Sequence, residues 1–517
     1  MNTFRKFFRR YNICFLVSFV IILSIFYSLL SILRHMHFQS GGFDLGLYDQ
    51  AVWRFSQFLD PYNTIKERII FGDHMVLTLP LLAPLLYLWN DVRILLVVQA
   101  IAIAVSSVPI YFIALKRTVS NLAAWAVTFL YSLFFGIQFG IFFDFHPIIL
   151  GVSLLAFLVW SIEYGKKKLF WLFLMLSLLT QENMGIAVFC LGLCYIFRKN
   201  AEGRTHHSRN WGIFNSGNEY RNIAVVLIVV GLLYSFLAVK ISAQFSPMGY
   251  QFMPEIPKSI PDFFTRLFDS EDKRLTWLYS YSWFSFLPVF SPGSLIAVIA
   301  DLSQYYVTGN KFSRMWSPFM HHRAILSVFL TLGLLDVLEG FTHYSRNWGF
   351  FNSGNEKRRS RVCVNPIIVL SIILVCVAML LQYKFHFALN KLTKAEYWKE
   401  EPWMKDTRTL LAQVPKDASV ATQQNLVPHL SHRKEIYLIY PRQHDITEEP
   451  CGQSLCWWLD YAGKPNYLVV DIRPNQWLTQ ILESNENWLS AISNMEKVGI
   501  IRLEKQIGGV KLFKIQQ

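Results

Sequence analysis

Apolar and polar segments alternate from residue 12 to residue 382 of the chain. A helix needs about 20 apolar residues to cross the hydrocarbon core of a bilayer, so this pattern predicts an α-helical polytopic membrane protein with about 11 spans. A further apolar segment, residues 75–90, contains two prolines and is short for a span, so we expect it to dip into the outer leaflet. The predicted spans are residues 12–34, 92–115, 121–143, 147–163, 169–181, 184–197, 223–243, 278–291, 293–307, 322–338 and 364–382.

The pattern changes after residue 383, where long apolar runs give way to short β-rich ones. A helical pattern at residues 476–495 lies among them. About 130 residues is a normal domain size, so residues 384–517 are predicted to form a small α/β domain that follows a transmembrane domain of residues 1–383. The β-rich runs are residues 418–422, 436–440, 467–472, 499–503 and 509–515.

Basic residues set the expected orientation. The N-terminus carries Arg5, Lys6, Arg9 and Arg10, and further lysine and arginine clusters follow alternate spans. Because basic residues are concentrated on the cytoplasmic side, we expect a cytoplasmic N-terminus and a chain in the inner (plasma) membrane. The loop at residues 35–74 and the C-terminal domain then lie outside the cytoplasm. The first apolar run is longer than a signal peptide and has no cleavage site after it, so it is expected to be retained.

The composition is typical of a membrane protein and argues against a nucleic-acid-binding protein. The chain is 53% hydrophobic and only 16% charged, with a net charge of +14. The positive charge occurs in short clusters beside apolar runs rather than as the continuous stripe of a nucleic-acid-binding surface, so no nucleic-acid partner is expected. Cys451 and Cys456 lie in a polar segment, and the sequence allows either a local disulfide or two free thiols there.

A polar segment occurs twice, at residues 202–221 and 339–358, with 16 of 20 positions identical. Each copy follows an inward span and precedes an outward one, so both are predicted to be cytoplasmic loops. Trp211 and Trp348 beside basic residues are typical of a headgroup-level anchor. Binding of a cytoplasmic partner is the alternative.

Acidic and imidazole side chains gather in four turns that the predicted topology places outside. Such groups near membrane depth usually mark function. Asp44 and Asp144 have a simpler alternative, which is to cap short helices. The segments are FDLGLYDQ with Asp44 and Asp49, FGDHM with Asp73 and His74, FFDFHPI with Asp144 and His146, and LTQENMG with Glu182.

Carboxylate and imidazole groups together suit two kinds of chemistry. They can act as a general base for a hydroxyl acceptor, or Asp44, Asp144 and His146 can bind a divalent metal ion. Their spacing does not decide between these uses. The segment TGNKFSRMWSPFMHHRA adds cationic groups that can bind a phosphate or extend from the membrane to its interface. These groups are Lys311, Arg314, His321, His322 and Arg323.

FDLGLYDQAVW, GDH, FDFHP, TQENMG and ASVATQQNLVPHLSHRKEIYLI together resemble the DUF2079 family of bacterial membrane proteins. That family is similar to the GT-C superfamily of polytopic glycosyltransferases, which use polyprenyl-phosphate sugars and keep a catalytic acid in the first external loop. The resemblance implies that Asp44 is this acid, as a general base or a metal-linked carboxylate. It also implies that Asp144, His146 and Glu182 line the same cavity. One departure is that GT-C acids often form an adjacent pair, whereas Leu45 follows Asp44.

We therefore expect transfer of a sugar from a polyprenyl-phosphate donor to a glycan, lipid or protein acceptor at the outer face. The two alternatives are a transporter or flippase of a lipid-linked intermediate, and a non-catalytic protein of envelope assembly. A flippase would carry polar groups through membrane depth, and the predicted spans have few. The residues expected to bind substrate are Asp49, Asp73, His74, Arg314, His321, His322 and Arg323.

Overall fold

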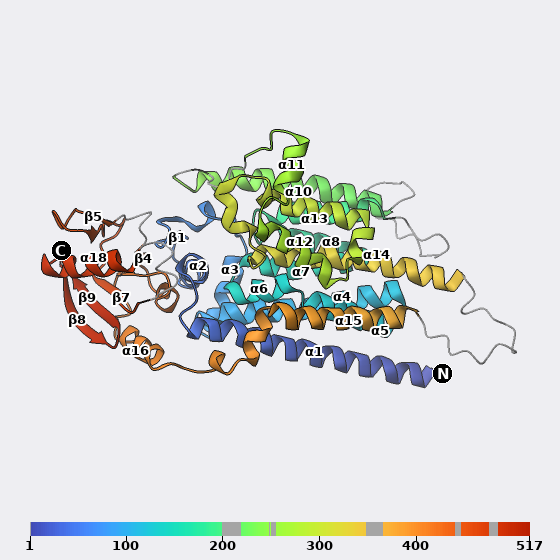
Figure 1. The fold of residues 1–517 in the computed structure, drawn as a ribbon, viewed down its shortest axis with the longest axis horizontal. Coiled ribbons are helices and arrows are strands. Elements are labelled where there is room, and N and C mark those ends of the chain that lie inside the picture. The colour runs from blue at the N-terminus through green and yellow to red at the C-terminus, as the bar shows by residue number, and fades with distance from the viewer. Residues whose placement is uncertain are drawn as a thin grey trace.

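In the computed structural model, a long helical bundle contacts a small α/β unit at one end (Figure 1). We call this the sheet end of the bundle and the opposite end, where α1 begins, the far end. The structure describes residues 2–198, 219–247, 249, 255–347, 366–439, 446–474 and 484–516, without the side chains of residues 2–11 and 343–347.

Each predicted span has a counterpart among the bundle helices. Among the described residues, six segments are long and apolar enough to cross a membrane: Asn12–Met36, Arg93–Thr118, Asn121–Phe143, Glu219–Gln244, His321–Thr342 and Pro366–Phe385. The other spans are shorter helices. The bundle helices are α1 (Asn2–Met36), α4 (Arg93–Thr118), α5 (Asn121–Ser132), α6 (Phe135–Phe143), α7 (Pro147–Glu163), α8 (Lys167–Leu178), α9 (Met184–Ile196), α10 (Glu219–Gln244), α12 (Glu271–Trp283), α13 (Pro292–Tyr306), α14 (Leu326–Asn347) and α15 (Pro366–Phe385).

One predicted span was placed wrongly. The apolar run suggested residues 278–291, but α12 begins at Glu271, because the Ser270 hydroxyl accepts a hydrogen bond from Lys273 N–H and caps the helix. The chain then turns through Ser285 and Phe286, both with positive φ, before a short 3₁₀ helix at Leu287–Phe290. The loop predicted before α12 also contains the short helix α11 (Ile260–Arg266).

The loop after α1 is folded rather than open. It contains a π-helical turn, η1 (Gly42–Gly46), then α2 (Leu47–Ser56) and a two-stranded ladder of β1 (Tyr62–Asn63) and β2 (Arg68–Ile69). The apolar segment at residues 75–90 forms the short helices α3 (Leu79–Leu82) and η3 (Ala83–Tyr87). Leu81 and Leu88 on this segment are exposed, as expected of a segment that contacts lipid.

The C-terminal unit is built on a five-stranded sheet of order β4-β3-β7-β9-β8. Strands β3, β4 and β7 are parallel, whereas β8 and β9 run antiparallel, and all five correspond to predicted β-rich runs. Helices α16 (Pro402–Leu411) and α18 (Asn485–Lys497) pack on it. The strands are β3 (Val420–Thr422), β4 (Ile436–Leu438), β7 (Tyr467–Asp471), β8 (Ile501–Ile507) and β9 (Val510–Ile515).

Cys451 and Cys456 are buried in this unit, where the Cys451 amide donates a hydrogen bond to Cys456 Sγ (3.1 Å) and both are free thiols. Residues 476–483 of the predicted helical pattern lie outside the described residues, as does Tyr440 of a predicted β-rich run.

The C-terminal unit packs directly on the loop after α1. Asp49 accepts hydrogen bonds from Ser431 Oγ (2.5 Å) and His432 Nε2 (3.1 Å), and Arg54 donates one to the carbonyl of Lys434 (2.8 Å). Gly46 allows the closest approach, since a Cβ there would lie 2.7 Å from Val427 Cγ1. The loop and the sheet therefore form one packed structure.

Ion pairs hold the far end of the bundle, and the pair between Arg117 and Glu163 is buried. Arg117 of α4 contacts Glu163 of α7 (2.5 Å) and Asp336 of α14 (2.9 Å), and Arg198 contacts Asp336 (3.4 Å) and Glu339 (3.3 Å). Most of the duplicated segment, including Trp211 and Trp348, lies outside the described residues.

Candidate functional site

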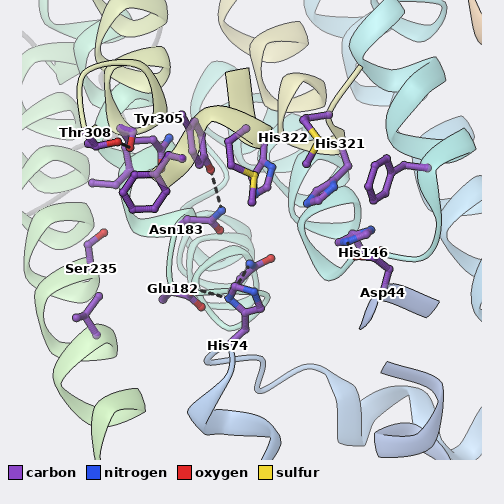
Figure 2. A pocket seen from close by; sticks show the side chains of 18 of the residues that line it. Asp44, His74, His146, Glu182, Asn183, Ser235, Tyr305, Thr308, His321 and His322 are labelled. Carbon is purple, nitrogen blue, oxygen red and sulfur yellow. Dashed lines mark hydrogen bonds and ion pairs between the residues drawn. The ribbon is translucent and has the colours of Figure 1, made fainter. Parts of the chain in front are cut away.

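A cavity of about 370 Å³ lies at the sheet end of the bundle, between the loop after α1 and helices of the bundle (Figure 2). All four polar turns singled out in the sequence contribute to its wall directly. The lining residues are Phe43, Asp44, Tyr48, His74, Phe143, His146, Gln181, Glu182, Asn183, Ile186, Ser235, Val239, Gln304, Tyr305, Thr308, Phe312, Met315, Met320, His321 and His322.

Asp44 and His146 form a pair at one end of this cavity. His146 Nε2 lies 3.1 Å from Asp44 Oδ1, although the two residues come from the turn η1 and from the start of α7. Neither side chain caps a helix, because the first position of α2 is preceded by Gly46 and the His146 side chain makes no cap bond to α7. The capping alternative for Asp44 therefore has no support in this geometry, and its second oxygen lies close to Gly41.

Asp144 lies behind this pair rather than in the cavity lining. Its Oδ2 accepts a hydrogen bond from the Gly41 amide (2.9 Å), and its Oδ1 is 3.9 Å from Arg34 Nε. Burial raises the pKa of Asp144 to about 6, and the Asp44 carboxylate adds to this rise while Arg34 opposes it. Asp144 thus fixes the backbone that precedes Asp44.

Three imidazoles are stacked along one wall of the cavity. The ring centroids of His146 and His321 are 3.6 Å apart, and those of His321 and His322 are 4.0 Å apart. Figure 2 shows His322, His321 and His146 in series, with Asp44 beyond His146. Within the described part of the chain, the Nδ1 atoms of all three have no hydrogen-bond partner. Such nitrogens are available to a ligand that carries oxygen atoms.

His74 and Glu182 form an ion pair on the opposite wall. His74 Nδ1 lies 2.7 Å from Glu182 Oε1, and the Met75 amide donates to Glu182 Oε2 (3.0 Å). Burial alone would lower the pKa of His74, but the Glu182 carboxylate outweighs burial and raises it to about 9. The pair is therefore ionised near neutral pH and connects the loop after α1 to the turn before α9.

The remaining predicted site residues lie elsewhere. Asp49 faces the C-terminal unit, and Asp73 is 3.6 Å from Lys66 Nζ. Arg314 is exposed and Arg323 is fully buried, where its guanidinium stacks near the rings of Tyr305 and Tyr306. None of these four lines the cavity.

The carboxylates and His146 do not present three ligands to one metal ion. His146 is bonded to Asp44, while Asp144 is turned toward Gly41 and Arg34. Among the described residues, no group of three or more His, Cys, Asp or Glu side chains is arranged to hold a metal. The geometry therefore suits acid–base chemistry better than metal ligation.

Several lining residues were not found from the sequence. Ser235 and Tyr305 come from within apolar runs on α10 and α13, and Thr308 follows α13. A single hydroxyl in an apolar run is common in membrane helices, so only the fold shows that these hydroxyls face the same space as Asn183.

Comparison with known proteins places the chain in a family. No curated protein is similar enough to match it. Among solved structures, it is similar to the crystal structure of ArnT from Cupriavidus metallidurans in the apo state, with 12% sequence identity, a TM-score of 0.49 and coverage of 97% of each chain. The family model described as "Predicted membrane protein (DUF2079)" matches residues 34–490, from the end of α1 into α18. Since this match covers most of the sequence, the chain belongs to the DUF2079 family.

Proposed function

We propose that this protein is a membrane glycosyltransferase that moves a sugar from a polyprenyl-phosphate donor to an acceptor hydroxyl at the outer face of the membrane. The observation that carries the proposal is the Asp44–His146 pair at one end of a cavity that His321 and His322 also line. A carboxylate and unpartnered imidazoles facing one space suit proton removal and phosphate binding together. The motifs around Asp44 and His146 also resemble those of the DUF2079 family, which is similar to the GT-C superfamily.

Asp44 acts as the general base in this proposal. The acceptor oxygen attacks the anomeric carbon, its proton passes to the free Asp44 oxygen, and the bond from the anomeric carbon to the phosphate oxygen breaks. The electron pair of that bond leaves with the polyprenyl phosphate. His146 orients Asp44 through the 3.1 Å contact and stabilises its charge before the reaction.

His321 and His322 bind the phosphate group. Their buried rings have unpartnered Nδ1 atoms, which donate hydrogen bonds to phosphate oxygens when they carry a proton. Negative charge grows on the phosphate as the glycosidic bond breaks, so these hydrogen bonds strengthen in the transition state. Arg323, directly after them in the sequence, adds positive charge from behind the wall.

Asp144 and Glu182 are positioning residues. Asp144 holds the Gly41 amide, so it fixes the start of the turn that carries Asp44. Both Glu182 oxygens are engaged, with His74 and with the Met75 amide, so Glu182 fixes the opposite wall. Neither carboxylate needs to touch the sugar for the reaction to occur.

Asp44→Asn tests this proposal. The protein is reconstituted with a panel of radiolabelled polyprenyl-phosphate sugars and membrane acceptors, and transfer is measured. We expect a loss of about 100-fold or more, the usual contribution of a general base, with normal membrane insertion. Asp60→Asn is the matched control, since Asp60 is in the same loop but 70% exposed and outside the cavity. Undiminished transfer by Asp44→Asn would show that Asp44 is not the base.

A further inference from the structure

The cavity has a second, chemically different part beyond the histidines. Figure 2 shows Asn183, Tyr305, Ser235 and Thr308 on the side of the cavity away from Asp44. Gln181 and Gln304 also line the cavity, so this part presents amides and hydroxyls. We name Gln181, Asn183, Ser235, Tyr305 and Thr308 the neutral wall. Among all the lining residues, none is lysine or arginine.

Hydrogen-bonding capacity on the neutral wall is unused. Within the described residues, Gln181 Oε1, Asn183 Oδ1 and Ser235 Oγ are buried and have no hydrogen-bond partner. Gln181 is only 2% exposed, and its amide nitrogen lies 3.3 Å from His74 Nδ1. Buried polar groups are normally hydrogen-bonded, so three such atoms around one cavity indicate a ligand that supplies donors.

Contacts with neighbouring residues determine which atoms of the neutral wall are left to bind a ligand. Asn183 Nδ2 donates to the Tyr305 hydroxyl (3.2 Å), so its carbonyl oxygen is the free atom. Ser235 Oγ lies against Gly185 of α9, since a Cβ at Gly185 would be 2.2 Å from it, and Ser235 lines the cavity at this point. The Thr308 hydroxyl donates to the Gln304 carbonyl (3.0 Å) and keeps its lone pairs. The wall therefore offers mainly acceptors, which match hydroxyl donors.

Charge in the cavity is already balanced. The neutral wall itself carries no carboxylate, and both oxygens of Glu182 are occupied, so an ammonium group on this wall would find no free carboxylate. A carboxylate group would meet the carbonyl oxygens of Gln181 and Asn183, and the ionised imidazole of His74 is already paired with Glu182. Burying an unpaired charge is unfavourable, whereas hydroxyls would satisfy the free acceptors.

We infer that the neutral wall binds the sugar ring of the donor and selects an uncharged sugar over amino sugars and sugar acids. This rests on the proposed function, since it takes the phosphate to occupy His321 and His322. Each hydroxyl of an uncharged ring donates to one free acceptor on the wall, and Ser235 and Asn183 contribute two of these contacts.

Equilibrium binding tests the inference. The full chain in lipid nanodiscs is loaded with a fluorescent polyprenyl phosphate, which is displaced by short polyprenyl phosphates carrying glucose, glucosamine, glucuronic acid or no sugar. We expect the glucose compound to compete at least about 10-fold better than either charged one. Ser235→Ala should weaken the glucose compound roughly 5- to 10-fold without affecting the sugar-free phosphate.

A charge variant gives the sharper result. Asn183→Asp should reverse the order, so that the glucosamine compound binds more tightly than the glucose compound. Asn310→Asp is the matched control, since it adds the same charge at an exposed position outside the cavity. Equal competition by the three sugar compounds, or an unchanged order in Asn183→Asp, would refute sugar selection by the neutral wall but leave the proposed donor class intact. No binding of the fluorescent polyprenyl phosphate would overturn the proposed donor class and this inference with it.

Discussion

The ion pair between His74 and Glu182 predicts a pH-dependent stability. His74 lies in the loop after α1 and Glu182 in the turn before α9, so their contact of 2.7 Å joins two parts of the cavity wall. Glu182→Gln keeps the shape of the side chain and removes its charge. The folded protein then loses the group that keeps His74 protonated.

The pKa of His74 rises from 6.5 to about 9 in the folded state. A raised folded pKa means that the pair stabilises the protein fully below about pH 6.5 and that this contribution is lost between pH 6.5 and 9. A shift of this size corresponds to about 3 kcal/mol. This figure is an upper bound, because the His74 side chain is 22% exposed and solvent screens the pair.

Thermal unfolding followed by tryptophan fluorescence measures the effect. An unfolding entropy of about 2.1 cal/mol/K per residue gives about 1 kcal/mol/K for the whole chain, so Glu182→Gln should lower Tm by up to about 3 °C at pH 6. The difference should shrink to under about 1 °C at pH 9.5. Glu271→Gln, an exposed change at the start of α12, is the control. A difference that stays constant or grows as pH rises would refute the reasoning.

Three further changes test other contacts. Gly46→Ala should lower the free energy of unfolding by about 1–3 kcal/mol, because the new methyl group collides with Val427. Proteolysis at the junction with the C-terminal unit should increase, and Val427→Ala in the same chain should restore stability. Arg117→Ala should destabilise by up to about 3–5 kcal/mol in denaturant titration, because the buried Glu163 then keeps only its longer ion pair with Arg198 (3.5 Å), and Glu163→Gln in the same chain should recover part of this. Asp144→Asn should raise Tm by up to about 3 °C at pH 8 and less at pH 4, since the raised folded pKa makes the ionised form costly above pH 6.

Hydrophobic run length was enough to locate most helices and the five strands of the sheet. These features depend on local pattern, which the sequence displays directly. The start of α12 was misplaced because a serine cap and a polar first turn lie outside the apolar run. Run length identifies the apolar part of a helix, whereas capping decides where the helix begins.

The sequence pointed to Asp44, His146, Glu182 and His74, and the fold brings these four to one cavity. The sequence also suggested Asp49 as a substrate-binding residue, whereas in the fold Asp49 contacts the C-terminal unit. The direction of the Asp44 and Asp49 side chains depends on the turn η1 and on residues of the C-terminal unit. Contacts of that range leave no periodic pattern in a single sequence.

The packing of the C-terminal unit on the turn around Asp44 has a consequence for biosynthesis. Asp49 and Ser431 are 382 residues apart in the chain. At about 5–20 residues per second, the ribosome reaches Ser431 roughly 20–80 s after it has added Asp49. During that interval the turn at residues 42–46 lacks the surface that Val427 provides. A newly inserted chain therefore cannot complete this site before its last quarter has been synthesised and folded, and truncation there would leave an inserted helical bundle with an incomplete cavity wall.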